Sequence, residues 1–206
     1  MGRVTRRVPR TRWDLRQEPI AIITHPDTVV VEEPLEIRVD GATVTTTMRT
    51  PGDDFDLAIG NLLAEGLLRA ADDVRTIMHC TDVGPDGAPT FNVVDLTLAP
   101  GASLQREPAR RSSVTSSACG VCGKQSIDDV LAHVGGGVRD DPITVTAESL
   151  VTMVAELGSH QKVFERTGGI HAAGLFTAEG VCRVVREDVG RHNAVDKVIG
   201  WAAREG

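Results

Sequence analysis

The sequence has few aromatic residues: phenylalanine and tryptophan make up 3% of its 206 residues, and tyrosine is absent. Proteins that hold single-stranded nucleic acid generally stack the bases on aromatic rings, so this scarcity argues against such a platform. The formal net charge of -7 at pH 7 points the same way, because a phosphate backbone attracts cationic surfaces. The core must therefore be aliphatic, and we expect no nucleic-acid partner.

Long apolar runs are also missing, since no stretch approaches the ~20 apolar residues that a membrane-spanning helix needs. The start of the chain is instead rich in arginine, and no apolar signal-peptide core follows it. We interpret residues 1–19 as a flexible basic tail and residues 20–206 as a single domain, long enough to bury a core without disulfide bonds. We expect no membrane partner, and four reduced cysteines predict a cytoplasmic location.

Strand-like and helix-like segments alternate along the chain, which predicts an α/β fold. An Asp-Gly pair between two β-rich runs predicts an early hairpin, and Thr50-Pro51 predicts the start of a helix that Gly66 ends. Helix capping also explains Arg49 and the aspartates near this start. The remaining predicted strands are residues 74–80, 91–98, 170–176 and 181–186. Two further helices are predicted to begin near Ser126 and Ala147, and a final helix carries His192, Asn193, Asp196, Lys197 and Trp201.

Two of the four cysteines, Cys119 and Cys122, stand two residues apart among glycines and serines, followed by Lys124. A predicted helix N-terminus and a nearby ammonium group lower the pKa of a cysteine and make the reactive thiolate more abundant. Structural zinc needs further ligands with regular spacing, and the other candidates are scattered. A thioredoxin-like role needs an early βαβ unit, whereas two hairpins come first here. Zinc binding and dithiol redox chemistry stay as alternatives to covalent sulfur carriage through a persulfide.

Two later segments, residues 167–173 and 187–197, place glycines and polar side chains beside apolar strands. Glycine amides and a helix start can hold phosphate, with Arg191, His192 and Lys197 as additional donors. A glycine turn followed by a capped helix with ordinary surface charges explains the same pattern equally well.

Zinc-dependent deamination is not expected. The nucleobase deaminases place a glutamate two residues after a ligating histidine and follow it with a Pro-Cys-X-X-Cys motif. Here Ala173 stands two residues after His171, and the cysteine pair comes earlier in the chain. The acid/base residue and the order of the ligands are therefore both missing.

Taken together, these motifs resemble the FdhD family of formate dehydrogenase accessory sulfurtransferases. The matching segments are Arg49-Thr-Pro-Gly-Asp53, Glu65-Gly66, Ser117-Ala-Cys119-Gly-Val-Cys122-Gly-Lys124, Thr167-Gly-Gly-Ile-His171-Ala-Ala173 and Glu187-Asp-Val-Gly-Arg-His-Asn193-Ala-Val-Asp-Lys197. They occur in the family's order, and the resemblance as a whole runs from about residue 20 to the C-terminus.

The resemblance implies a cytidine-deaminase-like mixed sheet with flanking helices, preceded here by an N-terminal β-hairpin region. It implies transfer of persulfide sulfur from a cysteine desulfurase to the molybdenum or tungsten bis-guanine-dinucleotide cofactor of apo formate dehydrogenase, with no tightly bound metal. Cys119 would carry the sulfur and Cys122 would assist. The implied cofactor-binding residues are Thr167, Gly168, Gly169, His171, Asp188, Gly190, Arg191, His192, Asn193 and Lys197.

One feature departs from the family pattern. Family members continue into a further α/β segment after the helix that carries Asp196 and Lys197, whereas this chain ends at Gly206. We therefore interpret residues 20–206 as an FdhD-like domain that lacks a C-terminal segment. Such a chain is expected to leave sheet edge and apolar surface uncovered, for which a homodimer is one solution.

Overall fold

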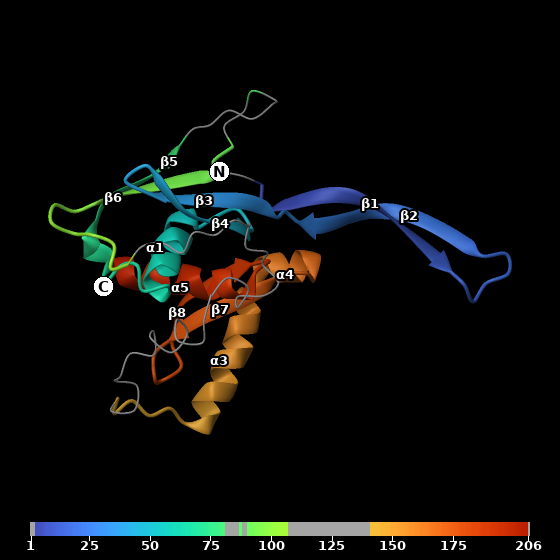
Figure 1. Ribbon diagram of the computed structural model, residues 1–206. Coiled ribbons are helices and arrows are strands. Elements are labelled where there is room, and N and C mark those ends of the chain that lie inside the picture. Colours follow the sequence, from blue (N-terminus) through green and yellow to red (C-terminus); the bar gives the residue numbers. More distant parts are fainter. Residues whose placement is uncertain (1–2, 81–86, 88–89, 107–140, 206) are drawn as a thin grey trace.

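The computed structural model describes residues 3–80, 87, 90–106 and 141–205 (Figure 1). Its strands are β1 (Thr5–Asp14), β2 (Ala21–Val30), β3 (Glu33–Val39), β4 (Ala42–Arg49), β5 (Val74–Cys80), β6 (Val93–Leu98), β7 (His171–Phe176) and β8 (Cys182–Asp188). Its helices are α1 (Asp54–Ala64), the short 3-10 turn η1 (Ala71–Asp73), α3 (Ala147–His160), α4 (Lys162–Thr167) and α5 (Arg191–Glu205).

A four-stranded sheet in the order β4-β3-β6-β5 forms the centre of the molecule. The β3–β6 pair is parallel and the other two pairs are antiparallel, so the sheet is mixed. Alternate residues of β3, Leu35, Ile37 and Val39, are buried, as expected for a strand with one face on the core. Leu57 and Leu62 of α1 join them in one apolar cluster, which places α1 against this face.

Helix α5 lies between α1 and the β7–β8 hairpin and contacts both (Figure 1). The molecule therefore has three successive layers, which are the four-stranded sheet, the two crossing helices α1 and α5, and the β7–β8 hairpin. The α1–α5 crossing is close because Gly60 of α1 and Gly200 of α5 face the backbone of the opposite helix. Any side chain at either position would occupy the space that the other helix fills.

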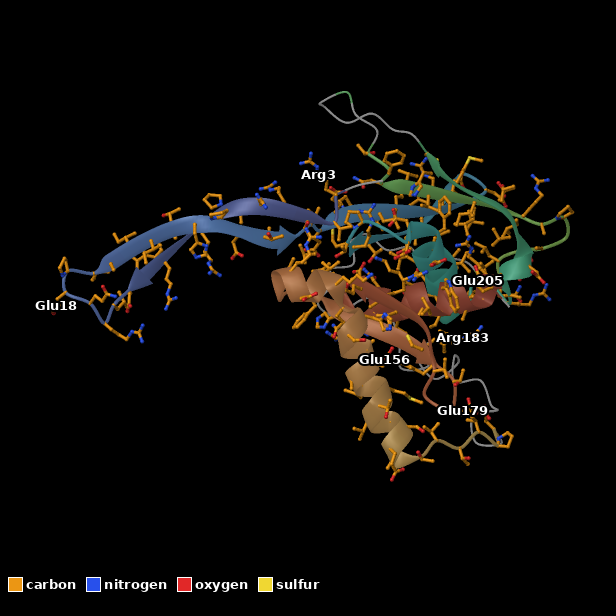
Figure 2. The ribbon with its side chains drawn as sticks, turned by 180° about the vertical axis from the view of Figure 1, so that it is seen from behind. Arg3, Glu18, Glu156, Glu179, Arg183 and Glu205 are labelled. Atoms are coloured by element: carbon orange, nitrogen blue, oxygen red, sulfur yellow. The ribbon has the colours of Figure 1, made fainter. Side chains whose placement is uncertain are left out.

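The arginine-rich start of the chain is a strand, and the prediction of a flexible tail is wrong for residues 5–14. Strand β1 pairs with β2 at all ten positions, from Thr5 opposite Val30 to Asp14 opposite Ala21. The resulting β1–β2 ribbon projects from the body in both views (Figures 1 and 2). The expectation failed because the partner strand, residues 21–30, lies outside the arginine-rich segment, and no pattern within residues 5–14 reveals that pairing.

The two predicted hairpins before the cysteines are confirmed as the pairs β3–β4 and β5–β6. The predicted strands at residues 170–176 and 181–186 pair with each other as β7 and β8. Gly66 follows the end of α1 with a φ of 63°, as a helix-ending glycine requires. The start of α1 differs from the prediction, since the helix begins at Asp54 rather than after Thr50. The predicted helix at Ser126 lies outside the described residues.

The predicted helix from Ala147 to about Val163 is interrupted at Gln161, where α3 ends and α4 follows. Leu150, Val151 and Val154 of α3 are 53%, 72% and 72% exposed. The half-buried side of α3, on Met153 and Leu157, faces the β7–β8 hairpin instead.

The mixed α/β class with flanking helices is confirmed, and the likeness to the cytidine deaminase fold stays a prediction. Among the helices of the described residues, we find none with the length and apolar character needed to cross a membrane.

Candidate functional site

The fold brings the two glycine-bearing segments together. His171 at the start of β7 pairs with Asp188 at the end of β8, and α5 begins three residues later at Arg191. Residues almost twenty positions apart thus meet at one end of the β7–β8 hairpin. This convergence is what a shared ligand site formed by both segments needs.

The predicted cofactor-binding residues include a group that is exposed to solvent and a group that is buried. Gly168, Gly169, His171, Arg191 and His192 are exposed at this end of the hairpin, where an incoming ligand can reach them. Gly168 has a φ of 66° and ends α4, which accounts for glycine there. Thr167 donates its hydroxyl to the Val163 carbonyl at 2.7 Å.

Asp188 and Lys197 form a buried ion pair. The Asp188 carboxylate and the Lys197 Nζ are 2.8 Å apart, and their side chains are 0% and 1% exposed. The same carboxylate accepts hydrogen bonds from the Gly190 amide at 2.8 Å and from Asn193 Nδ2 at 3.0 Å. These side chains fix the turn before α5 from inside, and a contact between them and a cofactor stays a prediction.

The Thr50 segment is held by this network. The Thr50 amide donates to Asp188 at 3.0 Å, and Lys197 Nζ donates to the Thr50 carbonyl at 2.9 Å. The Thr50 hydroxyl in turn accepts from the Val189 amide at 3.0 Å. The local sequence predicts that Thr50 caps a helix, but the hydrogen-bond partners of Thr50 lie about 140 positions away and cannot be found from local patterns.

Arg49 and the aspartates of α1 form ion pairs rather than helix caps. Arg49 is 1% exposed and donates to both carboxylate oxygens of Asp54, at 3.0 and 3.2 Å. Asp56 accepts from Arg186 at 3.0 Å and from Arg204 at 2.6 Å. Asp53, which precedes the helix, makes no capping hydrogen bond with its side chain. Buried charges are stable only when paired, which these contacts achieve.

A pocket of about 320 Å³ opens beside these aspartates, and sequence analysis missed it. Phe55, His79 and Phe91 form an aromatic wall, with the Phe55 and His79 rings 4.9 Å apart. Burial lowers the pKa of His79 below its ordinary value, although the Asp54 carboxylate opposes this, and thereby favours the neutral imidazole. The sequence feature that could have indicated this pocket was the placement of three aspartates within four residues near Arg49.

The reactive-cysteine prediction rests on Cys119 and Cys122, which lie outside the described residues. The two described cysteines, Cys80 and Cys182, are both free thiols of intermediate exposure. Burial and, secondarily, the nearby Glu156 raise the pKa of Cys182, so less of it is thiolate at pH 7. Within the described ranges, no group of three or more histidine, cysteine or acidic side chains is arranged to hold a metal ion.

Asp196 is a second buried carboxylate of the 187–197 segment. It is 8% exposed and accepts a hydrogen bond from Asn61 of α1 at 3.1 Å. Burial raises its pKa to about 6, and the charges of Glu65 and Asp188 act in the same direction. A carboxyl whose pKa is raised on folding costs stability where it is ionised, and the cost is complete above its folded-state pKa.

Asp196→Asn is therefore expected to stabilise the protein at pH 8 by about 1 to 3 kcal/mol, with the gain disappearing as the pH falls toward 4. The neutral side chain avoids the cost of a buried charge and can still accept from Asn61. Urea unfolding at pH 4, 6 and 8 measures this trend. The exposed Asp72→Asn provides the matched control and should show no such gain. Equal stability of Asp196→Asn and wild type at pH 8 would contradict the assignment.

Comparison with known proteins agrees with the motifs. The model of the FdhD/NarQ family matches residues 30–206. The chain belongs to the FdhD/NarQ family. The predicted family resemblance is thereby confirmed over both the central sheet and the β7–β8–α5 region.

Relatives in the FdhD/NarQ family are described as sulfur carrier proteins. The "Sulfur carrier protein FdhD" of Mycolicibacterium paratuberculosis is 55% identical over 183 residues, covering 89% of this chain and 67% of the relative. The Streptomyces avermitilis protein of the same name is 48% identical over 207 residues, covering 100% and 72%.

The fold of the chain is similar to a crystal structure from Desulfotalea psychrophila described as a formate dehydrogenase accessory protein. The TM-score is 0.64 and the coverage is 96% of this chain and 68% of that one. With 19% sequence identity, this match supports the fold alone.

Proposed function

We propose that this FdhD/NarQ protein is a sulfur carrier that supports formate dehydrogenase maturation. Family membership and relatives at 48% to 55% identity that are named sulfur carriers carry this conclusion. In finer detail, Cys119 accepts sulfur as a persulfide from a cysteine desulfurase. The acceptor is the molybdenum or tungsten bis-guanine-dinucleotide cofactor, which is the substrate of the transfer.

The loading step is a thiol–persulfide exchange. The Cys119 thiolate attacks the outer sulfur of the desulfurase persulfide, a new S–S bond forms on Cys119, and the desulfurase cysteine leaves as a thiolate. No net oxidation occurs, because one S–S bond replaces another. A lowered pKa of Cys119 would favour this step by increasing the thiolate fraction.

The unloading step uses the second cysteine. The Cys122 thiolate attacks the inner sulfur of the Cys119 persulfide, which forms a Cys119–Cys122 disulfide and releases the outer sulfur as hydrosulfide for the metal of the substrate. The two cysteines supply the two electrons that convert sulfane sulfur to sulfide. A dithiol reductant then restores both thiols, and the proposal places this cycle in the cytoplasm, where such reductants are present.

The exposed end of the β7–β8 hairpin supports a receiving site for the substrate. His171, Arg191 and His192 are exposed there beside Gly168 and Gly169. Arginine and backbone amides are suitable donors to the phosphates of a dinucleotide. The buried Asp188–Lys197 pair would keep this turn in a fixed shape.

Intact mass spectrometry tests the carrier role. After incubation of the full chain with a cysteine desulfurase and cysteine, we expect a mass increase equal to one sulfur atom, removable by a reducing thiol. Cys119→Ala should lose the increase, because the acceptor thiolate is gone. Cys182→Ala is the matched control and should keep it, because the pKa of that thiol is raised.

Two results would overturn the carrier assignment. One is a sulfur adduct that persists in Cys119→Ala and disappears in Cys182→Ala. The other is the absence of any adduct together with stoichiometric zinc that depends on Cys119 and Cys122, which would favour the metal-binding alternative.

A further inference from the structure

Glu187 lies on β8, one residue before the end of the strand, and its side chain contacts a different element from those of its neighbours. Arg186 donates to Asp56 of α1 at 3.0 Å, and Asp188 accepts from the Thr50 amide at 3.0 Å. Successive side chains of a strand point to opposite faces of the sheet. The Glu187 side chain therefore points away from α1, and on that side it meets α4.

The Glu187 carboxylate accepts hydrogen bonds from two successive backbone amides of α4. The Val163 amide donates to one oxygen at 2.9 Å, and the Phe164 amide donates to the other at 2.8 Å. The first amides of a helix have no acceptor within the helix, and Gln161, which precedes α4, gives no side-chain cap. An ionised acceptor makes stronger hydrogen bonds than a neutral one. Glu187 thus supplies the cap that the sequence next to α4 lacks.

The two residues that donate to Glu187 also hold the glycine turn, residues 167–169, at the other end of α4. The Val163 carbonyl accepts from the Thr167 hydroxyl at 2.7 Å, and the Phe164 carbonyl accepts from the Gly168 amide at 2.7 Å. One helical turn therefore connects the Glu187 carboxylate to the glycine turn. The glycine turn leads directly into His171 at the start of β7 (Figure 1).

The backbone of Glu187 is tied to the other half of the proposed receiving site. Its carbonyl accepts from Lys197 Nζ at 3.4 Å, and Arg191 and His192 follow in the chain as exposed residues at the start of α5. The side chain of Glu187 thus holds the glycine turn, and its main chain belongs to the turn before α5. Among the side chains described above, Glu187 joins the two halves in this direct way.

We propose that Glu187 is a positioning residue, which sets the spacing between the glycine turn and the start of α5. The inference rests on the proposed function, because it concerns the site that receives the guanine-dinucleotide cofactor. Glu187 acts through the amides of Val163 and Phe164. Phosphate oxygens accept hydrogen bonds only from donors about 3 Å away, so the affinity of a ligand held by both halves depends on their spacing.

Calorimetric titration of the full chain with GDP tests this role. GDP is the probe because it carries the guanosine and the two linked phosphates of the proposed substrate. Glu187→Ala should raise the dissociation constant of GDP at least about tenfold, because α4 loses both hydrogen bonds to β8. Glu187→Gln keeps one carbonyl oxygen that can accept from one amide, so it should raise the constant about threefold. A graded loss of this kind is the expected result.

Thr146→Ala is the matched control for the loss of a helix cap. The Thr146 hydroxyl accepts from the Ser149 amide at the start of α3, away from the glycine turn. Urea unfolding should show a loss of stability for this variant and for Glu187→Ala. The dissociation constant of GDP should stay at the wild-type value in Thr146→Ala, because only Glu187 connects its helix to the receiving site.

Three outcomes would overturn the positioning role. The first is equal GDP affinity of wild type and Glu187→Ala, or of wild type and Glu187→Gln if circular dichroism shows that Glu187→Ala is unfolded. The second is an equal weakening of GDP binding by Thr146→Ala, which would mean that affinity only follows stability. The third is a wild type that binds no GDP, which would overturn the receiving site as well.

Sulfur loading distinguishes this inference from the carrier role. Glu187→Ala should gain one sulfur atom from a cysteine desulfurase as readily as wild type, because Glu187 is assigned to the receiving site and Cys119 to loading. A wild type that binds GDP in a Glu187-dependent way but gains no sulfur would overturn the carrier role and support the positioning role. Loss of loading in Glu187→Ala alone would overturn the assignment of Glu187 to the receiving site.

Discussion

Replacing Gly60 with alanine is expected to destabilise the protein by about 3 kcal/mol or more, and Gly200→Ala should have a similar effect. A Cβ at Gly60 would overlap the backbone carbonyl of Asp196, and one at Gly200 would overlap the backbone carbonyl of Asp56. Backbone atoms in a helix cannot turn aside as the end of a side chain can. The helices must therefore separate, which opens the interface between α1 and α5 along its length.

Urea unfolding and thermal melting measure this loss of stability. Gly158→Ala is the matched control, because its Cβ would meet nothing within 4 Å in helix α3. It should be neutral or stabilise by up to about 1 kcal/mol, as alanine favours helices over glycine. The double variant at Gly60 and Gly200 should cost less than the two single losses added, since one separation relieves both overlaps. A stability of Gly60→Ala within about 0.5 kcal/mol of wild type would contradict this description of the crossing.

Lys197→Met is expected to reduce the free energy of unfolding by about 3 to 5 kcal/mol. The change leaves the Asp188 carboxylate, which is 0% exposed, without its cation. Urea unfolding at pH 7 measures the loss. Asp188→Asn in the Lys197→Met background should recover part of it, because the buried charge is then removed as well.

An exposed ion pair gives the control for this prediction. Arg10 and Asp27 are 3.0 Å apart on the ribbon, with side chains 55% and 35% exposed, so Asp27→Ala should cost less than about 1 kcal/mol. The stability of Lys197→Met also distinguishes a structural role of Lys197 from a role in cofactor binding alone. If Lys197 served only to bind the cofactor, its replacement would leave the stability of the ligand-free protein unchanged.

Local sequence patterns predicted only part of the candidate site. The glycines and polar residues of segments 167–173 and 187–197 were correctly associated with turns and a helix start, and the predicted final helix is α5. The division into exposed His171 and Arg191 and buried Asp188 and Lys197 was not predictable, because burial depends on the Thr50 segment packing over the same turn.

The ion-pair partners of charged residues were likewise not predictable from the neighbouring sequence. Arg49 and the aspartates that follow it were attributed to helix capping, a role that short spacing suggests. In the structure, Asp56 is instead paired with Arg186 and Arg204, which lie 130 and 148 positions away. Nothing in the sequence near Asp56 indicates those partners.

The sequence by itself determined the alternation of hairpins and helices and the family, and it predicted the reactive thiols to be Cys119 and Cys122. These follow from turn residues, apolar periodicity and motif order, which are local properties. The tertiary structure decided that the basic first residues form a ribbon, that Gly60 and Gly200 let two helices touch, and that the two glycine-bearing segments meet. The physical reason is that these features are contacts between distant segments, whose energy depends on packing and burial that no local pattern encodes.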